Sequence, residues 1–248
     1  MRQLLIIILL FILCQFNTTA VQGQDGADSK INTITNKTIH DTAFLLREKS
    51  KDYYHAVYIE RDRQSADYKS ILDFKYNDYE NKEYKEAYQS IKQKHPAPFK
   101  KYNLTGLPKE WMPLHRYKNK YYIYSPSDEG DMARRIITDS TLIYWYMDGP
   151  YPKPLQSLKK LNDHTWLFKA DNFYPSKRTD TLVIHLIDQI NKIAVFEDSS
   201  APKGFRYSLY IAKENAKKFD LVINYCATEK TPDFLFDKID YAKLLKGK

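Results

Sequence analysis

From Trp111 onward the chain consists of short apolar and aromatic runs in which hydrophobic side chains recur at every second residue. Alternation with a period of two is typical of β-strands. The runs are Tyr121–Tyr124, Arg135–Thr138, Thr141–Met147, Thr165–Lys169, Thr181–Ile187, Lys192–Glu197, Arg206–Ala212 and Phe219–Tyr225. Because these short strands are regularly spaced and separated by turn-like residues, they predict a sandwich or a barrel.

The connections between these runs are short. Asp139–Ser140 reads as a tight turn, Asp188–Asn191 closes a hairpin, and Ala212–Lys218 is another brief link. Parallel neighbours need a dozen or more connecting residues, so antiparallel pairing is expected. We therefore predict an antiparallel meander of about eight strands, as a barrel or a strongly curved sheet, over residues 111–248. The tail after Cys226 is expected to close one end of it, as a short helix or an extended segment.

The run Thr141–Met147 is apolar on both faces, which predicts that it is covered on both sides. We expect the barrel interior on one side and the N-terminal region on the other. The next residues, Asp148–Pro154, contain three prolines at alternate positions. They predict a stiff loop that forms a rim or a rigid connection.

Residues 37–110 are predicted to be mainly helical, which makes the chain α+β. Asp41–Glu48 reads as a helix that opens at a capping aspartate. Asn81–Lys94 has an apolar stripe at steps of three and four residues and ends before two prolines, as an amphipathic helix does. Between them, Tyr54–Ile59 predicts a strand.

The N-terminus predicts export. Arg2 precedes the apolar run Leu4–Phe16, and small residues follow, so residues 1–23 read as a cleaved signal peptide without a later transmembrane segment. Residues 24–36 are polar and predict a flexible tether. Lipid attachment to Cys14 is disfavoured because bulky Leu13 precedes it. The expected location is the periplasm or the exterior, and only Cys226 remains after cleavage, so no intramolecular disulfide is expected.

The formal net charge is +8, but lysines alternate with acidic residues, as in Glu80–Glu86. This pattern indicates a mixed solvated surface, and together with export it argues against a nucleic-acid partner. No dinucleotide, phosphate-loop, nucleophile-elbow or zinc-protease motif is present, and the six histidines are scattered. We therefore expect no cofactor, no metal site and no catalytic residues. Ser127–Asp131 has acidic residues that suit calcium, but its spacing favours a solvated turn.

Two residues could carry chemistry. His185 lies on Thr181–Ile187, on the face of Val183 and Ile187, and is expected to point to an interior or to lie under the helical cover. It is the best single candidate for a polar anchor in a cavity, although a hydrogen-bonded structural histidine is the commoner case. Cys226 paired with a histidine would be a nucleophile, but no catalytic signature surrounds it, so a small buried side chain is expected.

A signal peptide followed by a meander of short strands resembles the calycin group, the lipocalin-like and fatty-acid-binding-like small barrels. The resemblance covers about half of the chain, from Trp111 to Cys226. The Gly-x-Trp signature of lipocalins is absent, because Gly106 and Trp111 are too far apart, so no family site residue is carried over.

The resemblance implies a non-enzymatic protein that binds a small apolar or amphipathic ligand in the barrel mouth. The expected lining residues are Tyr144, Trp145, Tyr146, Trp166 and His185. Two alternatives stay open. A protein–protein module, such as an envelope inhibitor or a toxin-immunity protein, predicts a filled barrel and a protein partner in the envelope. A hydrolase with an unrecognised site predicts a cleft with paired carboxylates.

Overall fold

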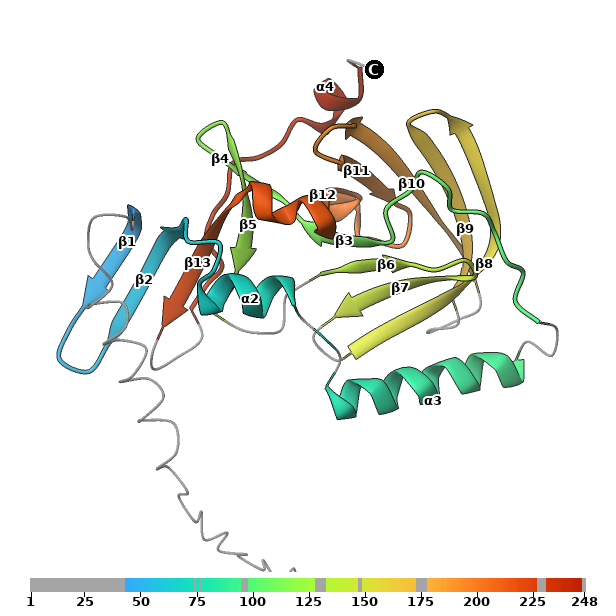
Figure 1. Ribbon diagram of the computed structural model, residues 1–248, viewed down its shortest axis with the longest axis horizontal. Helices are drawn as coiled ribbons and strands as arrows, with labels where there is room; N and C mark the ends of the chain where they lie inside the picture. Colours follow the sequence, from blue (N-terminus) through green and yellow to red (C-terminus); the bar gives the residue numbers. More distant parts are fainter. Residues whose placement is uncertain are drawn as a thin grey trace, which may run out of the picture. The chain divides into compact units, whose positions relative to one another are not determined.

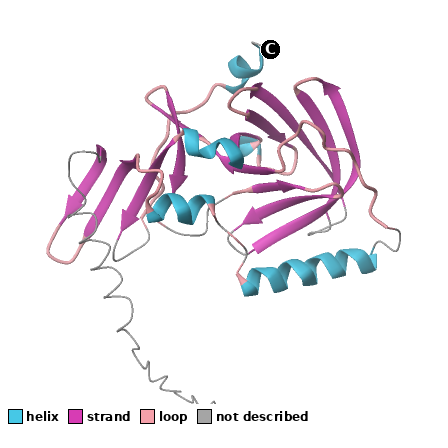
Figure 2. Cartoon of the chain, in the orientation of Figure 1, coloured by secondary structure: helices cyan, strands magenta, loops and turns pink. Residues whose placement is uncertain are grey.

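The computed structural model describes residues 43–73, 75, 77–94, 98–127, 133–146, 149–172, 178–226 and 231–246 (Figures 1 and 2). These residues belong to one unit, Thr38–Lys248, and the other unit is Met1–Lys37. The predicted signal peptide, the tether and Cys14 lie outside the described residues, as does the acidic part of the Ser127–Asp131 turn. The predicted division of the chain at residue 110 remains a prediction.

Eight antiparallel strands close into a barrel, as the alternating pattern predicts. The strands are β3 (Glu110–Pro113), β6 (Arg135–Ile137), β7 (Thr141–Tyr146), β8 (Gly149–Asn162), β9 (Thr165–Asn172), β10 (Arg178–Asp188), β11 (Ile193–Asp198) and β12 (Tyr207–Ala212). From β6 to β12 each strand pairs with the next one in sequence, and β12 pairs with β3 to complete the circle. The α+β class and the eight-stranded meander are thus confirmed.

A second sheet has five strands in the order β1-β2-β13-β5-β4. Their bounds are β1 (Ala43–Lys49), β2 (Tyr54–Glu60), β4 (His115–Tyr117), β5 (Lys120–Ser125) and β13 (Asp220–Cys226). Two of the eight predicted strands, β5 and β13, therefore lie outside the barrel, and they pair in parallel. The link Ala212–Lys218 contains a 3-10 helix and leads from the barrel to this sheet rather than between neighbours. Sequence spacing misses this arrangement because β5 and β13 are separated by most of the barrel.

The barrel lumen is filled by side chains from the inward faces of its strands. Trp111 packs edge to face on Phe196 at 5.2 Å, and Phe196 contacts Tyr210 at 4.4 Å between ring centroids. Phe168 and Ile184 have no solvent exposure. We call this group, which also contains Tyr144, Trp166, Leu182 and Leu186, the lumen cluster. Eight-stranded barrels have an interior that side chains can fill, and this one uses it for packing.

The proline-rich segment after β7 is a strand rather than the predicted loop. It forms the first half of β8, where Pro150, Pro152 and Pro154 lie opposite Trp145, Ile143 and Thr141. Proline lacks the N–H group that a central strand needs. Among the described residues, β9 pairs with β8 only from Leu155 onward, so the prolines lie where β7 is the only described strand that pairs with β8. Asp148 lies outside the described residues.

The N-terminal region mixes strands with helices. The helix expected over Asp41–Glu48 is wrong, because Ala43–Lys49 is strand β1. Pairing with β2 explains the difference, since it places Phe44 against Tyr58 with ring centroids 5.9 Å apart. The strand predicted at Tyr54–Ile59 is confirmed as β2, and the amphipathic helix as α3 (Asp78–Lys94). Helix α3 packs against β8 of the barrel.

Residues 231–240 form neither helix nor strand, and the tail ends in helix α4 (Tyr241–Lys246), so a short helix is present as predicted. We call Thr231–Asp240 the C-terminal segment. Its Phe234 and Phe236 pack with Val57 and Val222 on one face of the five-stranded sheet. Helix α4 contacts β10, and Tyr241 stacks on Tyr207 at 5.7 Å. The tail therefore joins the two sheets.

Candidate functional site

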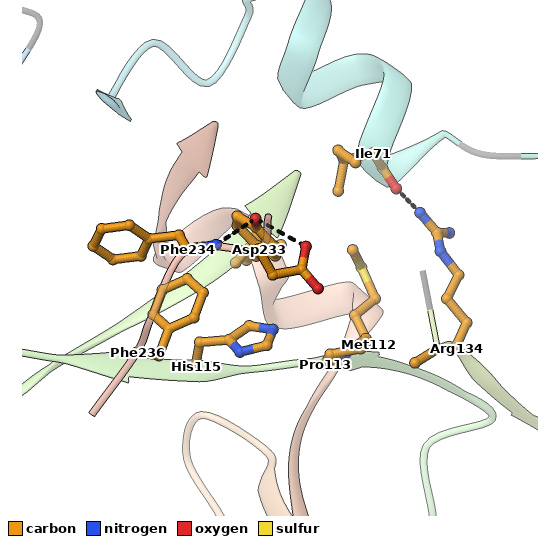
Figure 3. A pocket seen from close by; sticks show the side chains of 11 residues that line it. Ile71, Met112, Pro113, His115, Arg134, Asp233, Phe234 and Phe236 are labelled. Carbon is orange, nitrogen blue, oxygen red and sulfur yellow. Dashed lines mark hydrogen bonds between the residues drawn. The ribbon is translucent and has the colours of Figure 1, made fainter. Parts of the chain in front are cut away.

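One pocket lies where the chain passes from the barrel to the five-stranded sheet. Its volume is about 270 Å³, and we call it the His115 pocket (Figure 3). The lining residues are Ile71, Met112, Pro113, His115, Ile123, Tyr124, Ala133, Arg134, Asp233, Phe234 and Phe236. The site is mainly apolar with a few polar groups, which is the usual composition of a small-molecule site, and its volume is slightly below the usual range.

The position of His115 follows from the local chain path. Strand β3 ends at Pro113, the amide of Leu114 donates to the carbonyl of Leu209 in the barrel, and β4 begins at His115. The imidazole stacks on Phe236 with centroids 4.4 Å apart and meets the edge of Tyr124 at 5.5 Å. The ring points into the pocket in Figure 3. Burial lowers the pKa of His115 to about 4, so the ring is neutral at physiological pH.

A carboxylate enters the same pocket from the C-terminal segment. The Tyr124 hydroxyl donates to Asp233 Oδ1 at 3.2 Å and accepts the amide N–H of Phe234 at 3.0 Å (Figure 3). It also accepts the Asn224 side-chain N–H at 3.1 Å. Burial is the main cause that raises the pKa of Tyr124. The phenol therefore remains a hydrogen-bond donor at neutral pH and orients the Asp233 carboxylate.

The opposite side of the pocket is formed by Arg134, which precedes β6. Its Nη2 donates to the carbonyl of Ile71 in the last turn of α2 (Ala66–Leu72). The last carbonyl groups of a helix have no partner within the helix, and a cation there also interacts favourably with the helix dipole. Burial lowers the pKa of Arg134 to about 10, so the side chain stays charged at neutral pH. Arg134 thus fastens α2 to the barrel beside the pocket.

A hydrogen-bond network holds the C-terminal segment in place. The Thr231 hydroxyl donates to Asn224 Oδ1 at 3.2 Å, and the Thr231 amide N–H donates to Ser127 Oγ at 3.1 Å. Asn224 Oδ1 also lies 2.8 Å from His55 Nε2, and His55 Nδ1 lies 3.3 Å from Glu48 Oε2. The segment that carries Asp233 is therefore anchored to β2, β5 and β13. This rigidity favours a preformed pocket.

His115 predicts a measurable dependence of stability on pH. The unfolded chain takes up a proton near pH 6.5, whereas folded His115 does so only near pH 4. Acidification through this interval therefore favours the unfolded chain, and the expected loss is about 2 kcal/mol, since the ring keeps some solvent contact. Urea unfolding of the wild type and of His115→Phe between pH 7 and pH 4 measures it. The stability difference between them should narrow or reverse on acidification, and parallel curves would contradict the assignment.

The predicted lining residues do not form one site. Tyr144 and Trp166 are buried in the lumen cluster, whereas Trp145 is buried on the outer face of β7. Tyr146 belongs to β7, but its side chain lies outside the described residues. His185 does not point to the interior: it faces outward, with Nε2 3.7 Å from Glu197 Oε2. The sequence analysis correctly separated the face of His185 from that of Leu182, Ile184 and Leu186. The face of the leucines and Ile184 is the one that points into the barrel.

Cys226 lies opposite a histidine, but a different one from His185. The register places it across from His55 on β2. Both ring nitrogens of His55 already have side-chain partners, Glu48 and Asn224. Because a general base needs a free ring nitrogen, this arrangement supports a structural histidine rather than an activated Cys–His pair.

Sequence reasoning missed His115, Tyr124 and Asp233. They lie on β4, on β5 and in the C-terminal segment, and no local motif links them. One wall of the His115 pocket could have been predicted from the alternating phenylalanines of the tail. Phe234 and Phe236 are half-buried, whereas Asp233 and Leu235 are exposed. This alternation shows that one side of the tail packs on the protein.

Within the described ranges, no group of three or more His, Cys, Asp or Glu side chains is arranged to hold a metal ion. The helices of the described part also include none that is long and apolar enough to cross a membrane. In comparisons with known proteins, no family model, curated protein or solved structure matches this chain.

Proposed function

We propose that this chain is an exported, non-enzymatic binding protein that holds a small amphipathic molecule in the His115 pocket rather than in the barrel lumen. The observation that carries the proposal is the contrast between the two places. The lumen cluster consists of packed, fully buried side chains, whereas the His115 pocket is an apolar space of about 270 Å³ with polar groups at its edge.

The lining suggests how such a ligand would be oriented. Its apolar part would contact Met112, Phe234 and Phe236. Neutral His115 can donate or accept one hydrogen bond, and the Asp233 carboxylate accepts from a hydroxyl or amine. The ligand class is therefore a molecule with an aromatic or branched apolar body and a donor group.

A hydrolase is less well supported by the same residues. The described lining contains one carboxylate, Asp233, and no serine, threonine, cysteine or lysine. A histidine with a pKa of about 4 is also a weak general base at neutral pH, because proton transfer is most effective when the pKa is near the working pH.

The test is native mass spectrometry of the protein purified from its own producing cells. A reproducible small-molecule adduct is expected on the wild type, and Asp233→Asn or His115→Phe should weaken its binding about tenfold, the loss that follows from one hydrogen bond to a charged or buried polar group. Asp237→Asn is the matched control, since this exposed residue lies on the same segment. Loss of the adduct in Tyr144→Phe, with full binding in both pocket variants, would place the ligand in the lumen instead. The same spectrum reads the mature N-terminus and so tests export.

A protein–protein module is a second candidate, and the filled lumen is the observation that favours it. It predicts that the purified protein carries no small adduct and that a second polypeptide accompanies it in the native spectrum. The two functions are therefore separated by the mass of what is bound.

A further inference from the structure

A second space lies between α3 and the proline-rich half of β8. Its volume is about 550 Å³, and we call it the α3–β8 groove. Ala87 and Ile91 of α3 line it together with Pro150 and Pro152 of β8. These side chains give the groove an apolar floor, and the polar groups around that floor determine what fits.

Along its proline-rich half, β8 directs carbonyl groups but no N–H groups away from β7. The amide of Trp145 donates to the carbonyl of Arg134, so the backbone groups of Trp145 point toward β6. The backbone groups of the preceding residue, Tyr144, therefore point toward β8, where Tyr144 lies opposite Tyr151. Successive residues of a strand alternate in direction. Pro150 and Pro152 therefore direct their carbonyl groups away from β7, and proline has no N–H. Such an edge cannot pair with another strand, but it can accept hydrogen bonds from a ligand.

The helical wall of the groove is acidic. Glu83 and Glu86 are three residues apart on α3, so they share one face of the helix, and both line the groove. The charge of Glu83 is the main cause that raises the pKa of exposed Tyr79. Lys82 approaches Glu86 at 3.9 Å, but both side chains are well exposed, and such a pair is weak.

The cations near the inner end of the groove are balanced by other carboxylates. Lys153 Nζ lies 2.9 Å from Asp180 Oδ2, and Arg178 Nε lies 2.9 Å from Asp180 Oδ1. Lys153 also donates to Ser200 Oγ at 3.3 Å, and Ser200 donates to Asp198 at 2.6 Å. Both cations thus pair with the same carboxylate, Asp180, and Lys153 reaches a second carboxylate, Asp198, only through the Ser200 hydroxyl. Of the charged residues that line the groove, Lys153 is paired with Asp180, and the other two are Glu83 and Glu86.

We propose that the α3–β8 groove is a binding site for a small aliphatic diamine or polyamine. The ammonium groups would donate to the Glu83 and Glu86 carboxylates and to the outward carbonyl groups of Pro150 and Pro152. The methylene chain would lie on the apolar floor of Ala87 and Ile91. The groove shares no lining residue with the His115 pocket, so binding at the two sites can be tested separately.

The experiment is calorimetric titration of the full chain with 1,6-diaminohexane. The wild type is expected to bind at one site, and Glu83→Gln/Glu86→Gln should weaken binding at least about tenfold. The matched control is Asp52→Asn/Glu214→Gln, which removes the same charge at exposed positions away from the groove and should bind within about twofold of the wild type.

The permethylated analogue hexamethonium tests the role of the carbonyl edge. It has the same charge and a similar chain but no N–H donors, so it should bind at least about tenfold more weakly than the diamine. Equal binding of the two cations, equal loss in both double variants, or no heat with the wild type would each overturn the proposal. Asp233→Asn should leave diamine binding unchanged, and a loss there would assign the diamine to the His115 pocket instead.

Discussion

Replacing Phe168 with alanine is expected to lower the free energy of unfolding by about 3–5 kcal/mol. Phe168 has no solvent exposure and lies in the lumen cluster, opposite Leu158 on β8 and Leu182 on β10. Truncation would remove the contacts of the ring with neighbours on both adjacent strands. It would also leave a cavity, because the strands of a closed barrel cannot move inward to fill it. Urea unfolding followed by circular dichroism measures the change.

Leu167 supplies the matched control, because it is the next residue on β9 and faces outward with partial exposure. Leu167→Ala should cost about 1 kcal/mol, as expected for a partly exposed side chain. A hollow, solvated lumen makes the opposite prediction, since Phe168 would then lose little by truncation. Equal effects of the two substitutions would therefore remove the argument that places the ligand outside the lumen.

The barrel could be predicted from the sequence because it is determined by local features of the chain. A period of two in short runs such as Thr181–Ile187 determines which side chains face the interior, and the short turns between runs determine which strands pair. All eight predicted strands exist, although two of them belong to the second sheet. Short strands of similar pattern do not specify which sheet they join.

The errors arose where tertiary pairing overrides a local preference. Three prolines in Pro150–Pro154 are unfavourable in a strand unless one edge is free of a partner, and whether an edge is free depends on where β9 ends. Similarly, Ala43–Lys49 is a strand because β2 lies beside it. The His115 pocket was missed for the same reason, since its polar groups come from three distant segments that only the folded chain brings together.

The buried ionic cluster of the barrel wall leads to the second large effect. Asp180→Ala is expected to lower the free energy of unfolding by about 3–5 kcal/mol, because it leaves a buried ammonium group without its carboxylate. Lys153 is buried, its Nζ lies 2.9 Å from Asp180, and its other polar contact is the Ser200 hydroxyl. The cation also lies 4.1 Å from the centre of the Tyr144 ring, which cannot replace a carboxylate.

Replacing the lysine of this pair should lower the free energy of unfolding by less than replacing the aspartate. This difference is the sharper test. In Lys153→Met the carboxylate of Asp180 keeps the Arg178 guanidinium and the Asn172 side-chain N–H at 2.8 Å. The expected loss is about 1–2 kcal/mol, that of a hydrogen-bonded pair whose remaining charge is still partnered. Urea unfolding at pH 7 compares the two variants. If Lys153→Met were the more damaging, or if both changes were small, the cluster would be hydrated, and its charges could not be treated as balanced within the barrel wall.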